Sequence, residues 1–291
     1  MTMLYDRKTA TLLDHSEGME RQLEFYYGTF LGRCLLKIFT QRVFSKAYGW
    51  YLSSRYSQKK IKKYIDSNPI DLGDYEKDTY TSFNDFFTRK RKNVCWDTDL
   101  NNLIAPADSK MSCYEISKDL VLFIKNSQYT LEELLQCNTI PESFAGGKCL
   151  VFRLTLSDYH RYLYIDTGYS KKAKSILGVL HTVRSVALSK VKVFARNSRE
   201  WTVLHTQNFG RVVQIEVGAL EVGKIVNHKK KGDFLRGMEK GYFAYGGSTI
   251  ILLFEKEAVK IDQDILEYSS QEIETIVHIG EKIGVKDRYI Y

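Results

Sequence analysis

The sequence predicts an α+β protein in which a helical N-terminal part precedes a β-rich domain. From about residue 100 onward, short apolar runs alternate with turns rich in Gly, Asn and Asp: LVLFIK, CLVFRLT, RYLYIDTG, RVVQIEVGALEVGKIV and YFAYGGSTIILLFEK. Closely spaced runs of this kind are typical of strands. Residues 20–66 instead place apolar side chains such as Leu31, Leu35 and Ile38 at helical spacing. We therefore expect a helical region at 1–95 and a barrel-like or sandwich-like β-rich domain at 96–291.

The helical region combines large aromatic side chains with interleaved basic residues. This pattern is typical of a helix lying in a membrane interface. It fits equally well a helical hairpin that packs on the protein's own core, and the pattern alone does not decide between the two. The aromatic members are Phe25, Tyr26, Tyr27, Phe30, Phe39, Phe44, Tyr48, Trp50 and Tyr51, and the basic ones are Arg33, Lys37, Arg42 and Lys46.

Composition and charge limit the possible classes of function. The chain has 291 residues and a formal net charge of +8, which attracts polyanions, with nucleic acid and anionic lipid as the two candidates. Its five cysteines are dispersed and form no C-x-x-C pair, which argues against a disulfide framework and a zinc site. The six histidines show no metal-binding spacing, so we expect no metal. No secretory signal or apolar run of spanning length is predicted.

Three short helices are expected outside residues 20–66. The run TLEELL predicts a helix at Thr130–Leu135, with Thr130 and Glu133 as a capping box. The run SSQEIETIVH predicts another near residues 269–278. A third holds Phe86 and Phe87 and begins at Ser82 or Asn84.

Three polar residues stand out against their strand-like surroundings. Asp108 lies in the turn APADSKM, His160 lies in LSDYHRYLYIDTG, and Ser248 follows Gly246 and Gly247 in YGGST. Taken singly they fit an Asx-turn, a packed histidine and a β-bulge. Taken together, an aspartate, a histidine and a serine match the requirements of an activated hydroxyl nucleophile. Spacing alone does not choose between these interpretations.

The ordered motifs carry more information than the single residues. They are FNDFFTRK, APADSKM, LSDYHRYLYIDTG, LHTVRSVAL, NSREWTVLHTQNFGRVVQIEVGALEVGKI and KGDFLRGMEKGYFAYGGST, and the family pattern to which they belong runs from about residue 20 to 260. In this order they resemble the phosphatidylserine decarboxylase family, and the branch found in clostridia and related bacteria most closely.

The resemblance implies a lyase made as a zymogen that cuts itself. The cut would fall between Gly247 and Ser248 and leave a β chain of residues 1–247 and an α chain of residues 248–291. The glycines at 246 and 247 would leave the attacked carbonyl open, and Thr249 would be a supporting residue. Ser248 would become a covalent pyruvoyl cofactor that forms a Schiff base with phosphatidylserine, releases CO2 and yields phosphatidylethanolamine.

The same resemblance assigns the helpers of Ser248. An Asp108–His160 pair would activate the serine, and His160 would later return a proton to the product. Many family members carry a second histidine where this chain has Leu163, so His181 is the alternative base. Ser109 replaces a usual glycine, and Arg184 with Ser185 replaces a usual Asn-Pro pair.

The substrate class also implies partners and a location. A phospholipid substrate favours the membrane-interface interpretation of residues 20–66, and the basic residues favour anionic lipid. We expect a peripheral protein on the cytoplasmic side of the cell membrane, associated α and β chains, a homodimer, and no nucleic-acid partner. The alternatives are a pyruvoyl decarboxylase of a soluble amino acid and an unprocessed lipid-binding paralogue.

Overall fold

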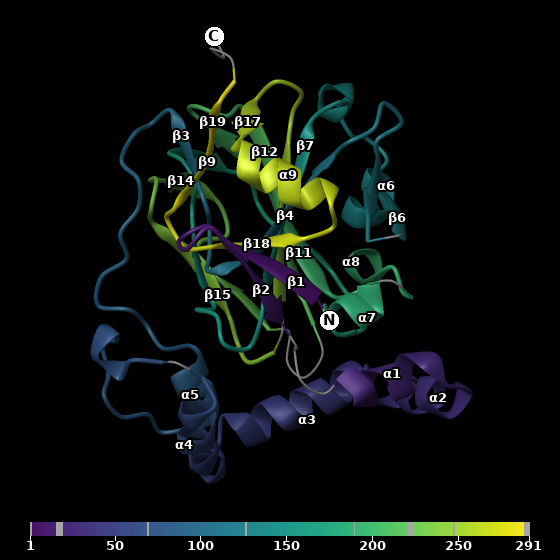
Figure 1. Cartoon of the computed structure of the whole chain (residues 1–291), viewed down its shortest axis with the longest axis vertical. Helices are drawn as coiled ribbons and strands as arrows, with labels where there is room; N and C mark the ends of the chain where they lie inside the picture. The colour runs from purple at the N-terminus through teal and green to yellow at the C-terminus, as the bar shows by residue number, and fades with distance from the viewer. Residues whose placement is uncertain are drawn as a thin grey trace.

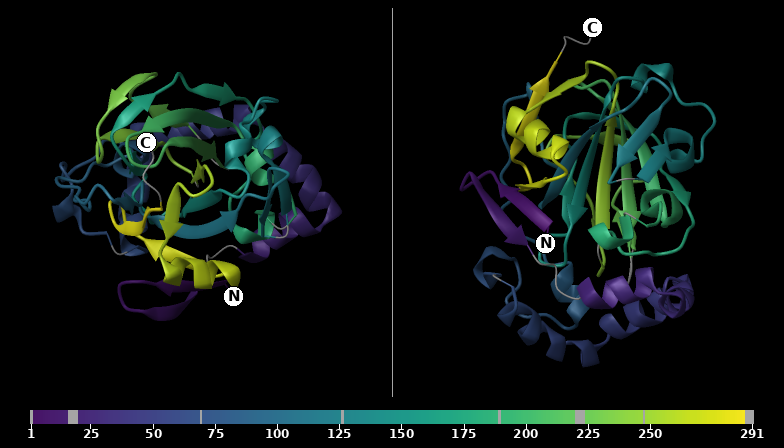
Figure 2. Two further views of the ribbon diagram at one scale, coloured as in Figure 1. Left: turned by 90° about the horizontal axis from the view of Figure 1, so that it is seen from above. Right: turned by 45° about the vertical axis from the view of Figure 1, so that its right-hand side comes forward.

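The computed structural model describes residues 2–15, 20–68, 70–125, 127–188, 190–219, 224–246 and 248–287. It has the expected α+β composition, and sheets dominate the part that follows the helices. Figures 1 and 2 show a β-rich body with a layer of helices across one end.

The helices expected in residues 20–66 are present. They are α1 (Glu20–Gly28), α2 (Phe30–Phe39), α3 (Arg42–Leu52) and α4 (Lys59–Asp66). We call these four helices the helical arm. In Figure 1, α1, α2 and α3 lie across the bottom of the body, and α4 lies beside α5 (Phe83–Phe87). Within the described residues, no helix is long and apolar enough to cross a bilayer.

A large sheet forms the centre of the body. Its order is β14-β9-β11-β12-β16-β7-β4-β18-β1-β2, with β10 paired to β11. The bounds in that order are Gly232–Phe234, Gly168–Ser170, Arg199–Thr206, Arg211–Gly218, Ser248–Phe254, Lys148–Leu154, Ser109–Glu115, Glu274–Val277, Thr2–Asp6 and Thr11–His15, with β10 at Lys174–Ile176.

Smaller sheets and short helices cover the large sheet. One three-stranded sheet has the order β13 (Ile225–Asn227), β15 (Glu239–Phe243) and β8 (Arg161–Leu163). A second has the order β17 (Val259–Ile261), β19 (Lys282–Lys286) and β3 (Asn102–Ile104). A hairpin pairs β5 (Val121–Ile124) with β6 (Ser127–Thr130). The remaining helices are α6 (Leu131–Leu135), α7 (Ser185–Leu188), α8 (Val193–Arg196) and α9 (Gln263–Ser270).

The core has two halves, one on each face of the large sheet, and β16 contributes side chains to both. Every residue of β16 is buried. Ile250, Leu252 and Phe254 pack into a first cluster with residues of the three-stranded sheets. Ile251 and Leu253 pack into a second cluster with α1, α2, α6, α7 and α8. Side chains alternate between faces along a strand, which explains why this segment reads as a continuous apolar run rather than an alternating one.

Two local expectations are confirmed. Thr130 caps α6, and the capping box with Glu133 is complete. Ser82, rather than Asn84, caps α5 by accepting a hydrogen bond from the backbone N–H of Asp85. Both caps satisfy backbone groups that a short helix otherwise leaves unpaired.

The helix expected near residues 269–278 is wrong. The chain leaves α9 at Ser270 and enters strand β18, which lies between β4 and β1. Glu274 of this strand forms a fully buried ion pair with Arg153 of β7 at 2.5 Å. Pairing on both edges stabilises the strand and overrides the local helical pattern, as tertiary context commonly does.

The start of the chain also differs from an all-helical region at 1–95. Residues 2–15 form the β1–β2 hairpin, and β1 pairs in parallel with β18 at the edge of the large sheet. The first residues therefore pack with the last strands of the β-rich body, while the division at residue 95 stays a prediction.

Candidate active site

Ser248 is the first residue of β16, and its register fixes the face to which it points. It lies opposite Gly218 of β12 on one side and Leu154 of β7 on the other. Because side chains alternate along a strand, Ser248 shares a face with Ile250 and Leu252, toward the first core cluster. The neighbouring Thr249 points to the opposite face, where its buried hydroxyl has no hydrogen-bond partner among the described residues.

His160 meets Ser248 on that face. Its Nδ1 atom lies 3.3 Å from Ser248 Oγ, and both residues are almost completely buried. His160 immediately precedes β8, and its backbone carbonyl accepts a hydrogen bond from Phe243 of β15. The ring of Phe87 packs against the imidazole with 4.2 Å between ring centres. The short helix α5 and two strands therefore hold the imidazole beside the serine.

The hydrogen bonds of His160 define which ring nitrogen carries the proton. Nε2 lies 3.0 Å from the carbonyl oxygen of Thr155. A carbonyl oxygen only accepts, so Nε2 donates, and the lone pair of Nδ1 faces the hydroxyl of Ser248. Burial lowers the pKa of His160 to about 4, although Asp158 opposes this effect. The imidazole is therefore neutral near pH 7, in the form that accepts a proton.

Asp158 fixes the loop that orients His160, a role that the sequence analysis missed. Its carboxylate accepts hydrogen bonds from the backbone N–H of Thr155 at 2.6 Å and from its hydroxyl at 2.8 Å. Lys110 donates to the same carboxylate at 2.7 Å. The spacing T-x-x-D in TLSDYH is the signal for this turn, because Thr and Asp bond to backbone groups two or three residues away.

Asp108 has partners other than His160. It lies in the turn before β4, and Arg91 donates to its Oδ2 at 2.6 Å. The backbone N–H of Ile279 donates to its Oδ1 at 2.8 Å. Tyr159 links Arg91 to His160. Its hydroxyl accepts a hydrogen bond from the backbone N–H of Arg91, and Tyr159 directly precedes His160 in the sequence. Among the described residues, Nε2 of His160 bonds to the carbonyl of Thr155 and not to Asp108.

His181 lies in a different environment from Ser248. Its Nδ1 is 3.2 Å from the hydroxyl of Tyr27 of α1, which belongs to the second core cluster. Its backbone N–H donates to Asn197. Burial, assisted by Arg196, lowers its pKa to about 4. Among the described contacts, Ser248 bonds to His160 and not to His181.

The positions where the sequence departs from the family's usual residues have structural consequences. Leu163, in place of a second histidine, is buried in an apolar cluster with Tyr75, Tyr159 and Ile279. Ser109 donates to the carbonyl of Ala107 at 3.2 Å and so adds a bond within the turn at Asp108. The N–H of Arg184 donates to the hydroxyl of Thr182.

The chain before Ser248 takes a backbone conformation that favours glycine. Gly246 has φ of +131°, a region that L-residues with a side chain rarely adopt. The N–H of Tyr245 donates to the side chain of Asn84, which anchors this segment to α5. Gly247, the other half of the expected scissile bond, lies outside the described residues.

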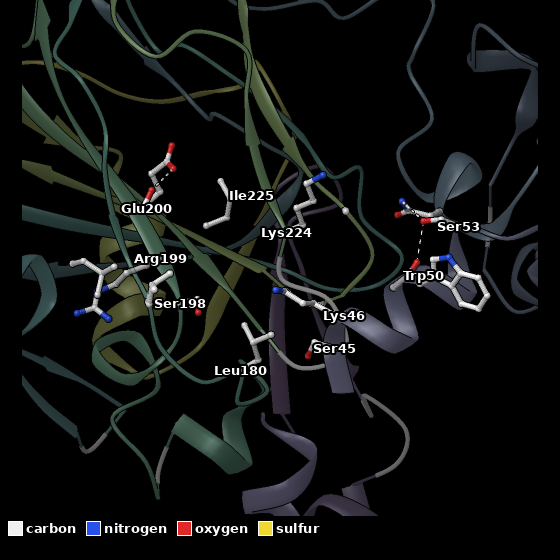
Figure 3. Close-up of a pocket in the computed structure, with 16 residues that line it drawn as sticks. Ser45, Lys46, Trp50, Ser53, Leu180, Ser198, Arg199, Glu200, Lys224 and Ile225 are labelled. Carbon is white, nitrogen blue, oxygen red and sulfur yellow. Dashed lines mark hydrogen bonds between the residues drawn. The ribbon is translucent and has the colours of Figure 1, made fainter. Parts of the chain in front are cut away.

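A cavity of about 600 Å³ opens between the helical arm and the edge of the sheets. Ala244, four residues before Ser248, lies on its wall, while Ser248 itself does not. Figure 3 labels residues from α3, β11 and the start of β13 around it, and β10 adds Ser175 and Ile176. The lining residues are Ser45, Lys46, Gly49, Trp50, Ser53, Asn84, Ser175, Ile176, Leu177, Leu180, Ser198, Arg199, Glu200, Lys224, Ile225 and Ala244.

Comparison with known proteins places the chain among related sequences. The family model described as "Phosphatidylserine decarboxylase" matches residues 83–285. A phosphatidylserine decarboxylase proenzyme 2 of Clostridium acetobutylicum is 49% identical over 284 residues, which cover 97% of each chain. A phosphatidylserine decarboxylase proenzyme of Clostridium botulinum is 40% identical over 98% of this chain and 100% of its own. One from Desulfitobacterium hafniense is 39% identical over 99% of both. A family model that matches most of the chain and relatives of these identities over nearly their full length show that the chain belongs to the phosphatidylserine decarboxylase family.

Proposed function

We propose that this chain is the proenzyme of a phosphatidylserine decarboxylase, a lyase that converts phosphatidylserine to phosphatidylethanolamine and CO2. The observation that carries the proposal is the contact between Ser248 Oγ and the unprotonated Nδ1 of His160. The curated relatives that match over almost their whole length are named as proenzymes of this enzyme.

The first reaction is the cut between Gly247 and Ser248. The Ser248 hydroxyl gives its proton to Nδ1 of His160 as Oγ attacks the preceding carbonyl carbon. The C–N bond then breaks, the imidazolium returns the proton to the departing amine, and an ester joins the two chains. Elimination across the Cα–Cβ bond of residue 248 releases the carboxylate of residue 247, and hydrolysis of the product leaves a pyruvoyl group and ammonia.

The residues around Ser248 suit these steps. A buried neutral histidine accepts the serine proton without first losing one of its own, because its pKa is lowered to about 4. The hydrogen bond from Nε2 to Thr155 keeps the ring from rotating away. Once present, the pyruvoyl group supplies an electron sink that lets the substrate lose CO2. His160, as the polar side chain in contact with residue 248, is the proposed proton donor to the product.

The position of the cut explains how two chains would stay together. The α chain would begin with β16, which pairs along its length with β12 and β7 of the β chain. All seven residues of β16 are buried. The proposed α and β chains therefore form one core and separate only when that core unfolds.

The helical arm supports peripheral attachment to a membrane. Phe30 on α2 is 79% exposed, and Val43 and Trp50 on α3 are 75% and 80% exposed. Lys37 and Lys46 lie between them in the sequence. Exposed apolar side chains with interleaved lysines suit insertion into the headgroup region of an anionic leaflet. We place the protein on the cytoplasmic side of the cell membrane.

Intact mass under denaturing conditions tests the proposed cut. We expect two masses that correspond to residues 1–247 and 248–291, with the smaller chain lacking a free amino terminus. The same sample is assayed with phosphatidylserine in vesicles and with free serine. A protein that remains one chain while it decarboxylates phosphatidylserine contradicts the pyruvoyl mechanism. A protein that remains one chain and binds lipid without turnover is the non-catalytic paralogue.

A further inference from the structure

We propose that the cut itself opens the path by which the lipid headgroup reaches residue 248. The new carboxyl end of the β chain, at Gly247, moves into the cavity of Figure 3, binds Lys46 and Lys224 there, and draws Tyr245 away from the reacting residue. This inference rests on the proposed function, because the carboxylate of Gly247 exists only after the cut.

The elimination step places a negative charge in the buried site. The bond between Cβ and Oγ of Ser248 breaks, so Oγ departs as one of the two carboxylate oxygens of Gly247. His160 accepts the Cα proton, which leaves with the ammonia as ammonium ion, so the imidazole returns to its neutral form. The departing oxygen starts 3.3 Å from Nδ1 of His160, where the serine is almost completely buried. The nearby Lys110 is already bound to Asp158. A buried carboxylate without a cationic partner is strongly unfavourable, and the substrate brings a second carboxylate to the same place.

Two lysines of the cavity provide the complementary charge. Lys46 extends from α3, and Lys224 directly precedes β13. Both are exposed and line the cavity. Over the residues that the structure describes, neither ammonium group forms an ion pair or a hydrogen bond. Because an ammonium group donates strong hydrogen bonds to a carboxylate, this pair of lysines suits a chain end that carries a negative charge.

The new chain end lies within reach of these lysines. The N–H of Ala244 donates to the carbonyl of Lys224 at 3.0 Å, so these two residues lie side by side on the cavity wall. Gly247 follows Ala244 by three residues, which span at most about 10 Å when fully extended. The carboxylate of Gly247 therefore reaches the cavity that holds Lys224 and Lys46 while the hydrogen bond of Ala244 stays in place.

Tyr245 lies between the cavity and the buried serine–histidine pair. Its backbone is next to the cavity wall, because its N–H donates at 3.2 Å to Asn84, and both Asn84 and Ala244 line the cavity. Its ring packs on Phe87 with 4.9 Å between ring centres, and Phe87 packs in turn on the imidazole of His160. In the uncut chain these rings separate the cavity from His160.

Movement of the chain end removes this cover. In the uncut chain, residues 244–247 join β15 to β16 and are held at both ends. After the cut they are held at one end, and the last residues of a chain are ordered only where contacts hold them. When Gly247 binds the lysines, Tyr245 moves with it, and the space beside Phe87 connects the cavity with residue 248. The headgroup then enters from the side of the helical arm, and its amine reaches residue 248.

Hydrogen exchange, resolved to single residues by mass spectrometry, compares the cut wild type with the uncut Ser248→Ala protein. We expect the amide of Tyr245 to exchange at least tenfold faster in the cut protein, because its bond to Asn84 is broken, whereas the amide of Ala244 stays protected in both. In the cut Lys46→Ala/Lys224→Ala variant, the amide of Tyr245 should exchange more slowly than in the cut wild type. Equal protection of Tyr245 in cut and uncut protein overturns the inference and leaves the proposed function intact. A wild type that stays uncut contradicts the proposed function, and this inference with it.

Decarboxylation of monomeric dihexanoyl phosphatidylserine tests the two lysines without a membrane. Lys46→Ala/Lys224→Ala should still cut itself but show at least a tenfold lower kcat/KM, because Tyr245 stays over the site. Lys118→Ala/Lys172→Ala removes two exposed lysines outside the cavity and should act like the wild type. Addition of Tyr245→Ala to the Lys46→Ala/Lys224→Ala variant should restore the activity, because the cover is then absent. A folded triple variant that stays impaired shows that the lysines act on the substrate itself, and the inference is wrong.

Discussion

Ser248 Oγ lies 3.3 Å from Nδ1 of His160, within a buried setting in which Nε2 of the same ring donates to the carbonyl of Thr155. In the proposed mechanism, Ser248 is the nucleophile and the neutral imidazole of His160 is its base. The orienting group is a backbone carbonyl, which is itself held by the Asp158 turn. In the proposed mechanism, the carbonyl of Thr155 orients the imidazole, which is the task of a triad's carboxylate.

Ser248→Ala should abolish both the self-cleavage and the decarboxylation, because the attacking oxygen and the precursor of the pyruvoyl group are the same residue. Denaturing electrophoresis and CO2 release are the measurements. Ser170→Ala is a matched control, because it removes a buried hydroxyl that donates to Gly232 and lies outside the site. Residual decarboxylation by folded Ser248→Ala protein argues against a pyruvoyl mechanism.

His160→Ala should stop the self-cleavage, whereas His181→Ala should leave it within about tenfold of the wild-type rate. The reason is that His160 contacts Ser248 and His181 contacts Tyr27 instead. General-base removal typically costs about 10²- to 10⁴-fold. The rate of chain conversion is followed by electrophoresis during synthesis in a cell-free system. The opposite ranking of the two variants means that His181 is the base.

Lowering the pH should destabilise the fold through its buried histidines. Burial lowers the pKa of His160 from 6.5 to about 4, so the unfolded chain binds a proton at a pH where the folded chain does not. The stability is therefore retained above about pH 6.5 and is lost as the pH falls toward 4. For this histidine the loss between pH 7 and pH 5 is about 2 kcal/mol.

Urea unfolding of the Ser248→Ala protein at pH 7 and pH 5 measures this loss on a single uncut chain. The same experiment on Ser248→Ala/His160→Gln removes the contribution of His160 and leaves the contributions of His181 and the carboxylates. If the free energy of unfolding depends on pH equally in the two proteins, the lowered pKa of His160 is contradicted.

Arg91→Ala should slow the self-cleavage if Asp108 has the proposed part in it. The change removes the 2.6 Å ion pair between Arg91 and the nearly buried carboxylate of Asp108. That carboxylate keeps its hydrogen bond from the N–H of Ile279. We expect about 1–3 kcal/mol lower stability and at least tenfold slower cleavage, with partial rescue by Arg91→Lys. Lys90→Ala, which breaks an exposed pair with Glu76, is the control. If folded Arg91→Ala protein cleaves itself at the wild-type rate, the orientation of Asp108 by Arg91 has no part in the mechanism.

Phe30→Ser/Val43→Ser should weaken binding to vesicles that contain anionic lipid by at least tenfold. Transfer of each apolar side chain out of water contributes about 1.5–3 kcal/mol. Vesicle sedimentation is the measurement. Phe123→Ser is the control, because Phe123 on β5 is also largely solvent-exposed, at 64%, but lies outside the helical arm. Equal loss in the control and the test variant contradicts attachment through the helical arm.

The sequence by itself determined the fold class, the helical region at residues 20–66 and the family, and it singled out Ser248 and His160, whose side chains lie in contact. These conclusions depend on local information: strand-like runs, helical periodicity, caps such as Thr130 with Glu133, and the order of the motifs. The turn at Thr155 and Asp158 was also readable in principle, because its spacing is local.

Only the tertiary structure decided which partners meet. Residues 274–277 became a strand because β4 and β1 lie on either side of them. Asp108 binds Arg91, and Nε2 of His160 binds Thr155. Lys46 and Glu200 share one cavity although α3 and β11 are far apart in the chain. Sequence patterns report the preferences of neighbouring residues, whereas contacts between distant segments depend on strand pairing and burial that no local pattern contains.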